Sequence, residues 1–150
     1  MNHCIKNSNP SPKVSVIIPV YNTGDYLRET LNSICTQTLE EQEIILLNDG
    51  STDGSMKIIE EYATKDSRIQ YHTQPNQGLS VARNQAMKHA TGKYIYFMDS
   101  DDLLDRNALQ QCYQTCEKDN LDFVFFDAEP ILDSARTENI PDYNRKEKID

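Results

Sequence analysis

The 150-residue sequence is poor in the features that mark nucleic-acid-binding and membrane proteins. Basic residues are few, because 15 Lys and Arg stand against 24 Asp and Glu, and the formal net charge is −9. A protein this negative is not expected to take a nucleic acid or an anionic lipid surface as its main partner. No stretch approaches the ~20 consecutive apolar residues of a transmembrane helix, and the N-terminus lacks the apolar core of a signal peptide. We therefore expect a cytoplasmic protein.

Several familiar motifs are absent as well. No GxGxxG pattern follows the first apolar run, and the sequence contains no GxxxxGK[ST] phosphate loop, which argues against dinucleotide-dependent dehydrogenases and P-loop enzymes. The four cysteines include no CxxC pair, and we expect them to be reduced thiols that lie mostly in the core. Without His or Cys partners nearby, they do not predict a zinc site.

What the sequence does contain is a regular alternation of apolar runs and helical periodicity. The clearest apolar runs, which are rich in β-branched residues, predict buried strands at residues 14–20 and 43–48. Shorter strands are predicted at residues 68–72, 93–98 and 121–126, with amphipathic helices between the strands. Because strands and helices alternate, we predict an α/β fold with a mostly parallel sheet flanked by helices in a single domain.

Both ends of the chain lack apolar periodicity. We expect a flexible leader at residues 1–12 and a folded domain at residues 13–132. Residues 133–150 are polar and charged, and we expect either a tail or the start of a region that continues in a longer protein.

The most informative stretch lies at residues 93–102 and reads KYIYFMDSDD. Its apolar part predicts a buried strand, so Asp99, Asp101 and Asp102 follow at the carboxyl end of that strand, where open α/β sheets bind ligands. Carboxylates this close repel one another unless they share a cation, and Mg²⁺ or Mn²⁺ suits such hard oxygen ligands. We predict a divalent-metal site, built by Asp99 and Asp101, that holds a phosphate-bearing ligand. A solvated acidic turn that caps the next helix is the alternative.

Two other polar clusters also follow predicted strands, namely Tyr21 with Asn22, and residues 49–53. In a parallel sheet the carboxyl ends of the strands lie along one edge, so these clusters and the acidic stretch are expected to face a single crevice. Arg83 lies in the segment before the acidic strand and is expected to bind a diphosphate or to orient one of the aspartates. An exposed helix arginine is the alternative for Arg83.

Four segments, taken in order, resemble a known family. They read VSVIIPVYN, LLNDGSTDGS, NQGLSVARNQAM and GKYIYFMDSDD. Together they look like the nucleotide-sugar-binding half of a family 2 glycosyltransferase of the GT-A, Rossmann-like fold, and the resemblance covers residues 13–132. It implies transfer of a sugar, with inversion at the anomeric carbon, from a nucleotide diphosphate donor that is usually UDP-linked. The acceptor would be a saccharide or a lipid-linked molecule in glycan or cell-surface polysaccharide synthesis, and the full-length enzyme could associate peripherally with a membrane.

The resemblance assigns a nucleotide pocket to positions that match the family's motifs. These positions are Pro19, Val20, Tyr21, Asn22, Asp49, Asp53, Gly78 and Arg83. The first four would surround the uridine, and Asp49 would accept the hydrogen at N3 of uracil, which a carboxylate can do as a pure acceptor. Asp53 and Gly78 would complete the pocket, and Arg83 would lie near its floor.

The resemblance also assigns the acidic stretch to the family's DxD motif. Asp99 would lie near the ribose, with Ser100 beside it in the nucleotide-sugar site, and Asp101 would bind the metal that bridges the diphosphate. Asp99 is a second metal ligand in this assignment, and Asp102 matches an additional acid that is a further candidate ligand. The cofactor, Mn²⁺ or Mg²⁺, would neutralise the charge that develops on the departing UDP.

Inverting transfer also needs a general base that takes the proton from the acceptor hydroxyl. In relatives this carboxylate lies well beyond the DxD motif, so we expect it to lie beyond residue 150 and the chain to be a truncated piece. Asp127 and Glu129 are the candidates within the chain. Two other functions stay open. One is a non-catalytic nucleotide-sugar-binding module, and the other is a phosphotransferase with an aspartate nucleophile, which would be expected to carry its DxD pair after the first strand.

Overall fold

Strands and helices alternate along the part of the chain that the computed structural model describes, which is residues 11–129. In order they are β1 (Val14–Val20), α1 (Gly24–Cys35), β2 (Gln42–Asp49), α2 (Ser55–Lys65), β3 (Ile69–Gln74), α3 (Leu79–Met87), β4 (Tyr94–Phe97) and α4 (Ala108–Asp119). This order confirms the predicted α/β class. No helix within the described residues is both long and apolar enough to cross a membrane. Most of the predicted leader and all of the predicted tail lie outside the described residues.

The strands form one parallel sheet in the order β3-β2-β1-β4. The central strand β1 is buried along its whole length, because its sequence VSVIIPV offers apolar side chains to both faces of the sheet. Pro19, which has no N–H to donate, lies near the carboxyl end of β1, beyond the point where pairing with β4 ends at Ile17 and Phe97. The mostly parallel sheet of the prediction is therefore confirmed.

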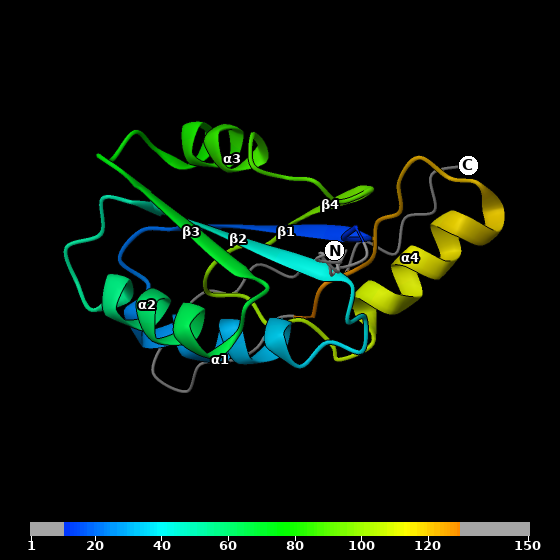
Figure 1. The fold of residues 1–150 in the computed structure, drawn as a ribbon, viewed down its shortest axis with the longest axis horizontal. Helices are drawn as coiled ribbons and strands as arrows, with labels where there is room; N and C mark the ends of the chain where they lie inside the picture. Colours follow the sequence, from blue (N-terminus) through cyan, green and yellow to red (C-terminus); the bar gives the residue numbers. More distant parts are fainter. Residues whose placement is uncertain (1–10, 130–150) are drawn as a thin grey trace, which may run out of the picture.

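Helices cover the sheet on both faces, with α1 and α2 on one face and α3 on the other (Figure 1). The two layers differ in depth. The core beneath α1 and α2 is built from large aliphatic side chains of both layers, among them Val16, Ile18, Leu27, Leu31, Ile34, Ile44, Leu46 and Ile59. The core beneath α3 is smaller, with Ala90 packed against the buried residues Ile17, Ile45, Leu47, Ala82 and Ala86. The sheet therefore has one thick and one thin hydrophobic layer.

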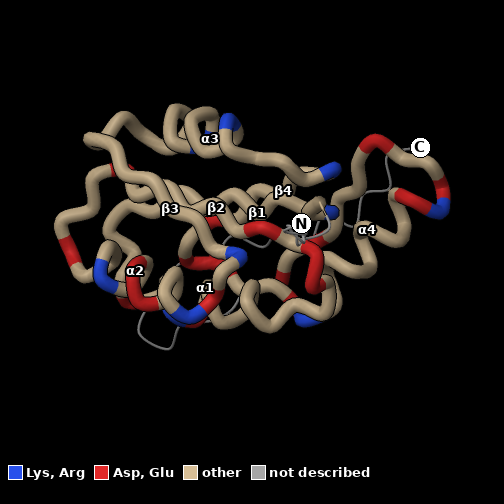
Figure 2. The backbone as a smooth tube through the Cα atoms, viewed as in Figure 1, with Lys and Arg blue, Asp and Glu red and all other residues tan. Residues whose placement is uncertain are grey.

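Charge also differs between the helices that cover the two faces. Figure 2 shows acidic residues along α1 and α2 and none along α3, whose sequence LSVARNQAM carries Arg83 and no acid. An anionic ligand beside α3 therefore meets less repulsion than one beside α1 or α2, although the whole chain has a net charge of −9.

Strand β4 is shorter and less buried than the sequence predicts. It forms the edge of the sheet among the described residues, and its side chains alternate between half-buried and exposed positions. Ile95 is 42% exposed and Phe97 is 43% exposed, because α3 packs mainly over β1 and β2. The prediction of a buried strand at residues 93–98 is therefore wrong in its burial and correct in its position.

The strand predicted at residues 121–126 is not formed, and this prediction is wrong. Residues 121–129 are irregular, and Phe123 and Phe125 are 72% and 87% exposed. Phe126 stacks against Tyr96 of β4 with ring centroids 6.0 Å apart, so the segment returns toward the sheet without joining it. An apolar run becomes a strand only where a neighbouring strand accepts its hydrogen bonds, and none does so within the described residues.

The connection between α3 and β4 is held tightly against the sheet. The Glu43 carboxylate of β2 accepts hydrogen bonds from the backbone N–H of Thr91 at 2.6 Å and of Gly92 at 3.0 Å. A Cβ atom at Gly92 would lie 2.7 Å from the backbone nitrogen of Ser15 in β1, so only glycine allows this close approach. These contacts set where β4 begins and hence where the acidic stretch lies.

Candidate functional site

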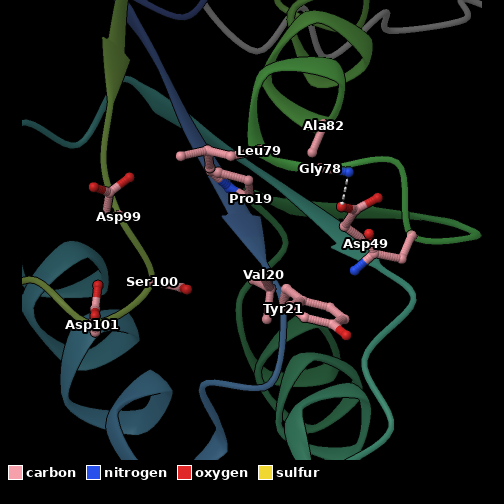
Figure 3. Close-up of a pocket in the computed structure, with 11 residues that line it drawn as sticks. Pro19, Val20, Tyr21, Asp49, Gly78, Leu79, Ala82, Asp99, Ser100 and Asp101 are labelled. Carbon is pink, nitrogen blue, oxygen red and sulfur yellow. Dashed lines mark hydrogen bonds between the residues drawn. The ribbon is translucent and has the colours of Figure 1, made fainter.

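The carboxyl ends of β2, β1 and β4 are neighbours in the sheet, and polar residues that follow them face one cleft. The cleft has a volume of about 440 Å³ (Figure 3). Most of the residues that the sequence predicts for a site line it, namely Pro19, Val20, Tyr21, Asp49, Gly78, Asp99, Ser100 and Asp101. The predicted single crevice at the carboxyl edge of the sheet is therefore present as a geometric feature.

Asp49 is the most buried carboxylate of the cleft, with 3% of its surface exposed. Its Oδ1 atom accepts hydrogen bonds from Gln74 Nε2 at 2.7 Å and from the backbone N–H of Gln77 at 2.9 Å. Its Oδ2 atom accepts one from the backbone N–H of Gly78 at 2.9 Å (Figure 3). A carboxylate has room for about four such bonds, so Asp49 shapes the loop before α3 and keeps acceptor capacity on Oδ2 for a ligand.

Gly78 sits where the loop turns into α3. Its φ of 86° lies in the region that glycine adopts without strain. This conformation lets its N–H donate to Asp49 and lets α3 begin at Leu79 beside the cleft. Asn76, Leu79 and Ala82 complete the lining on this side. These three residues were not predicted from the sequence, although their place between β3 and the acidic strand puts them at the same edge of the sheet.

Arg83 does not line the cleft but pairs with an acid that does. Its Nη2 atom forms a short ion pair with Asp99 Oδ1. Its side chain is 33% exposed, and its Nε atom is buried without a hydrogen-bond partner among the described residues. The structure therefore places Arg83 beside Asp99, in contact with an aspartate of the acidic stretch, and not among the residues that line the cleft, where the resemblance puts it.

The acidic turn from Asp99 to Asp102 carries its carboxylates close together. The backbone N–H of Asp102 donates to the carbonyl of Asp99 at 3.2 Å, which closes the turn. Partial burial, followed by the charges of Asp99 and Asp101, raises the pKa of the Asp102 carboxyl above its ordinary value. Asp102 does not line the cleft. The expected crowding of negative charge is therefore present, and Asp102 lies away from the ligand side of the turn.

The carboxylates of the turn are suited to a metal ion that is also bound by a ligand, and not to a metal ion bound by protein side chains alone. Within residues 11–129 no group of three or more His, Cys, Asp or Glu side chains is arranged to hold a metal ion. Mg²⁺ in nucleotide sites is commonly held by one or two carboxylates together with phosphate oxygens and water. Asp101 and Asp99 therefore suit a metal that arrives with a diphosphate, and they do not suit a metal that binds the protein alone.

Two predicted site residues support the loops and do not face the cleft. The side-chain carbonyl of Asn22 accepts a hydrogen bond from the backbone N–H of Thr52 at 2.8 Å. Asp53 accepts from the backbone N–H of Gly24 at 3.0 Å and of Ser55 at 2.9 Å. Burial raises the pKa of Asp53, but its donors Ser55 and Gly24 outweigh that effect and hold the pKa below its ordinary value. These contacts tie together the loops that follow β1 and β2.

The two candidate bases lie outside the cleft. Asp127 and Glu129 belong to the irregular segment after α4, are exposed, and do not line the cleft.

Comparison with known proteins identifies relatives of most of the chain. The family model described as "Glycosyl transferase family 2" matches residues 15–146. The chain is 46% identical over 102 residues to Glycosyltransferase GlyA of Streptococcus pneumoniae, a stretch that covers 68% of the chain and 15% of GlyA.

Solved structures are similar in fold as well. The crystal structure of S. aureus TarS 1-349 in complex with UDP matches with a TM-score of 0.67 at 34% identity, covering 71% of the chain and 32% of that protein chain. The mannosyltransferase PcManGT from Pyrobaculum calidifontis, in complex with GDP-Man and Mn²⁺, matches with a TM-score of 0.66 at 26% identity, covering 71% and 33% respectively. The chain thus spans a third or less of the length of each of these relatives.

Proposed function

The chain belongs to glycosyltransferase family 2 and shares the GT-A fold of its structural relatives, and from this premise we propose that its cleft binds the nucleotide of a UDP-sugar donor together with Mn²⁺ or Mg²⁺. The sugar would then pass with inversion to a saccharide or lipid-linked acceptor. Relatives crystallised with UDP and with GDP-Man and Mn²⁺ support a nucleotide diphosphate and a metal in this fold.

The proposal depends on one observation. The Asp49 carboxylate, which can only accept hydrogen bonds, lines the same cleft as the acidic turn. Asp49 ends β2, the acidic turn follows β4, and β1 lies between them. Strands β2 and β4 are two strand spacings apart, which is about 10 Å. A nucleoside diphosphate bridges a comparable distance from its base to its phosphates, so one ligand can contact both groups.

We assign base recognition to Asp49 and Tyr21. An ionised carboxylate only accepts hydrogen bonds, so Asp49 Oδ2 would accept the N3 hydrogen of uracil, which cytosine lacks. The Tyr21 side chain lines the cleft and is 50% exposed, which leaves its ring free to stack on a planar base. The other contacts of Asp49 hold the loop from Gln74 to Gly78 in place, so the same carboxylate would shape the pocket and read the base.

We assign the diphosphate to the acidic turn. A divalent metal bound there would act as a Lewis acid that neutralises charge on the departing UDP, and Asp101 with Asp99 would hold it. Arg83 would hold the Asp99 carboxylate in place through their ion pair. The N-terminus of α3, which begins at Leu79 beside the cleft, adds a partial positive charge that also favours phosphate.

The base preference tests this function. Calorimetric titration with UDP and with CDP, both in the presence of Mn²⁺, is expected to show tighter binding of UDP by about tenfold or more, since a hydrogen bond to a charged acceptor contributes roughly 1.5–3 kcal/mol. Asp49→Asn places an amide donor opposite N3 and is expected to shift the preference toward CDP. Asp119→Asn removes the same charge at the exposed end of α4 and should leave the preference unchanged. Equal affinities for UDP and CDP in the unmutated chain would refute the assignment.

Turnover separates the transferase from a non-catalytic binding module. Among the described residues that line the cleft, no carboxylate is free to act as general base under this proposal, because Asp49 would read the nucleotide and Asp99 and Asp101 would hold the metal. With a panel of UDP-sugars and acceptors, the chain is expected to release UDP slowly and to form no glycosylated product. Efficient transfer would contradict this and direct attention to Asp127 and Glu129. If any longer protein that contains this chain also fails to transfer sugar, the binding module is favoured.

A further inference from the structure

The acidic turn is anchored by the helix on the opposite side from α3. Thr30 lies on the inner face of α1 and is fully buried. Its Oγ1 atom lies 3.0 Å from the backbone carbonyl oxygen of Ser100 and 3.4 Å from the carbonyl of Tyr26 in its own helix. A helical threonine hydroxyl often bonds back to its own preceding turn. Here the shorter contact reaches across to the acidic turn, seventy residues away in the sequence.

Ser100 is the residue between the two carboxylates that face the cleft. It is 5% exposed, and Figure 3 shows it between Asp99 and Asp101 on the turn that passes over α1. Its hydroxyl lies 2.9 Å from the hydroxyl of Thr23, the residue that precedes α1. The backbone and the side chain of Ser100 are therefore both held by hydroxyl groups from the same helix region.

These contacts matter because β4 does not itself hold the turn. Its pairing with β1 ends at Phe97, and one further backbone bond joins the Met98 N–H to the Ile17 carbonyl at 3.0 Å. Asp99, Asp101 and Asp102 follow beyond that point and repel one another. A buried carbonyl without a donor is costly, so the Thr30 hydroxyl both satisfies Ser100 and fixes the turn against α1.

We infer that Thr30 is a positioning residue for the acidic turn, which holds the Ser100 backbone so that Asp99 and Asp101 point their carboxylates at a metal-bound diphosphate. Thr23 supports the same geometry through the Ser100 hydroxyl. The inference rests on the proposed function of the cleft. It does not require Thr30 to touch the ligand, because Thr30 acts through the backbone between the two acids.

The test compares variants at Thr30 with a control at Thr36, the residue that follows α1. Thr30→Val keeps the shape of the side chain and removes the donor, Thr30→Ser keeps the donor, and Thr36→Val removes an exposed hydroxyl whose bonds stay within the end of α1. For each variant, calorimetry gives the affinity for UDP with Mn²⁺ and for uridine, which has no phosphate, and thermal unfolding gives the stability.

Thr30→Val is expected to weaken UDP binding with Mn²⁺ by about 10- to 100-fold, the range seen when a residue that supports a metal ligand is lost. Uridine affinity should stay within error of the unmutated chain, Thr30→Ser should restore UDP binding, and Thr36→Val should change neither affinity. A purely structural role would instead weaken UDP and uridine together. That result, or UDP binding by Thr30→Val equal to that of the unmutated chain, would overturn the inference.

Failure of the proposed function and failure of the inference give different results. If the unmutated chain binds UDP without any dependence on Mn²⁺, the proposed function fails and the inference fails with it. If the unmutated chain depends on Mn²⁺ and only the Thr30 result is negative, the inference alone fails. Should Thr30→Val not fold, Thr23→Val makes a milder change at a half-buried position, and it is expected to weaken UDP with Mn²⁺ while sparing uridine. Unchanged UDP affinity in Thr23→Val would then decide against the inference.

Discussion

The two faces of the sheet are built differently. On one face, α1 and α2 pack large aliphatic side chains against β1 and β2, whereas α3 packs against the other face through Ala82 and Ala86. The small residues of α3 leave room at the carboxyl edge, where the cleft lies between α3 and the strand ends. From this comparison we expect the α1–α2 layer to supply most of the stability, while the α3 layer borders the cleft.

The acidic turn joins these two layers. Its carboxylates belong to the cleft on the α3 side, where Asp99 pairs with Arg83, while the Ser100 backbone is held by Thr30 of α1. Side chains keep the geometry that a ligand requires when a rigid part of the fold supports them. The α1–α2 layer therefore fixes the position of the acids that face the cleft on the α3 side.

The largest expected effect tests where the stability resides. Leu31 of α1 is fully buried, and Leu79, the first residue of α3, is 50% exposed and lines the cleft. Leu31→Ala is expected to lower the free energy of unfolding by about 2–5 kcal/mol, the usual cost of a cavity in a core. Leu79→Ala should change it by far less, as measured by urea denaturation at equal protein concentration. A comparable loss in both variants would contradict the difference between the layers.

A second effect tests how closely the α3–β4 connection is held to β1. Gly92→Ala would place a Cβ atom 2.7 Å from the Ser15 nitrogen, and the forced backbone shift is expected to cost about 1–3 kcal/mol. Gly54→Ala, before α2, meets nothing within 4 Å at a φ of −75°. That control should be neutral or stabilising by up to about 1 kcal/mol. Thermal unfolding of the pair distinguishes a tight connection from a loose one, and similar melting temperatures would indicate a loose one.

The smallest expected effect concerns pH on the α3 side. His72 of β3 stacks on His89 with ring centroids 3.6 Å apart, and burial, followed by the charge of His89, lowers the pKa of His72. Because the unfolded chain then takes up a proton more readily than the folded one, stability should be highest above the unfolded pKa of about 6.5 and fall as the pH drops through the folded pKa. Urea denaturation from neutral to mildly acidic pH should show a shallower decline for His72→Gln. An identical decline in the variant would show that the stacked pair does not contribute.

Much of the thick layer could be predicted from sequence, and less of the site could. The β-branched run at residues 14–20 and the run at residues 43–48 meet apolar neighbours on both faces, so their pattern alone predicts buried strands. The runs at residues 93–98 and 121–126 are as apolar, but their burial depends on which element lies beside them. Sequence does not carry that information, so the first run forms a strand that is less buried than predicted and the second run forms no strand.

Within the site, the residue types were predictable and their partners were not. The acids after β2 and β4 follow from the rule that parallel strands end at one edge. The three donors to Asp49, the pairing of Arg83 with Asp99, and the reach of Thr30 to Ser100 each join segments far apart in the chain. A threonine on the inner face of a helix has the same sequence pattern whether it contacts its own helix or a distant turn. These contacts become visible only when the fold brings the segments together.

The most direct test of the central claim is the dependence of UDP affinity on metal. Calorimetric titration of the chain with UDP is expected to show binding with Mn²⁺ that weakens sharply in EDTA and in Asp101→Asn, because a chain with a net charge of −9 repels a free diphosphate. Uridine binding should respond to neither change, and Asp119→Asn should behave as the unmutated chain. If UDP affinity is the same in Mn²⁺ and in EDTA, Asp101 is only a surface acid and the acidic turn is not a metal-dependent diphosphate site.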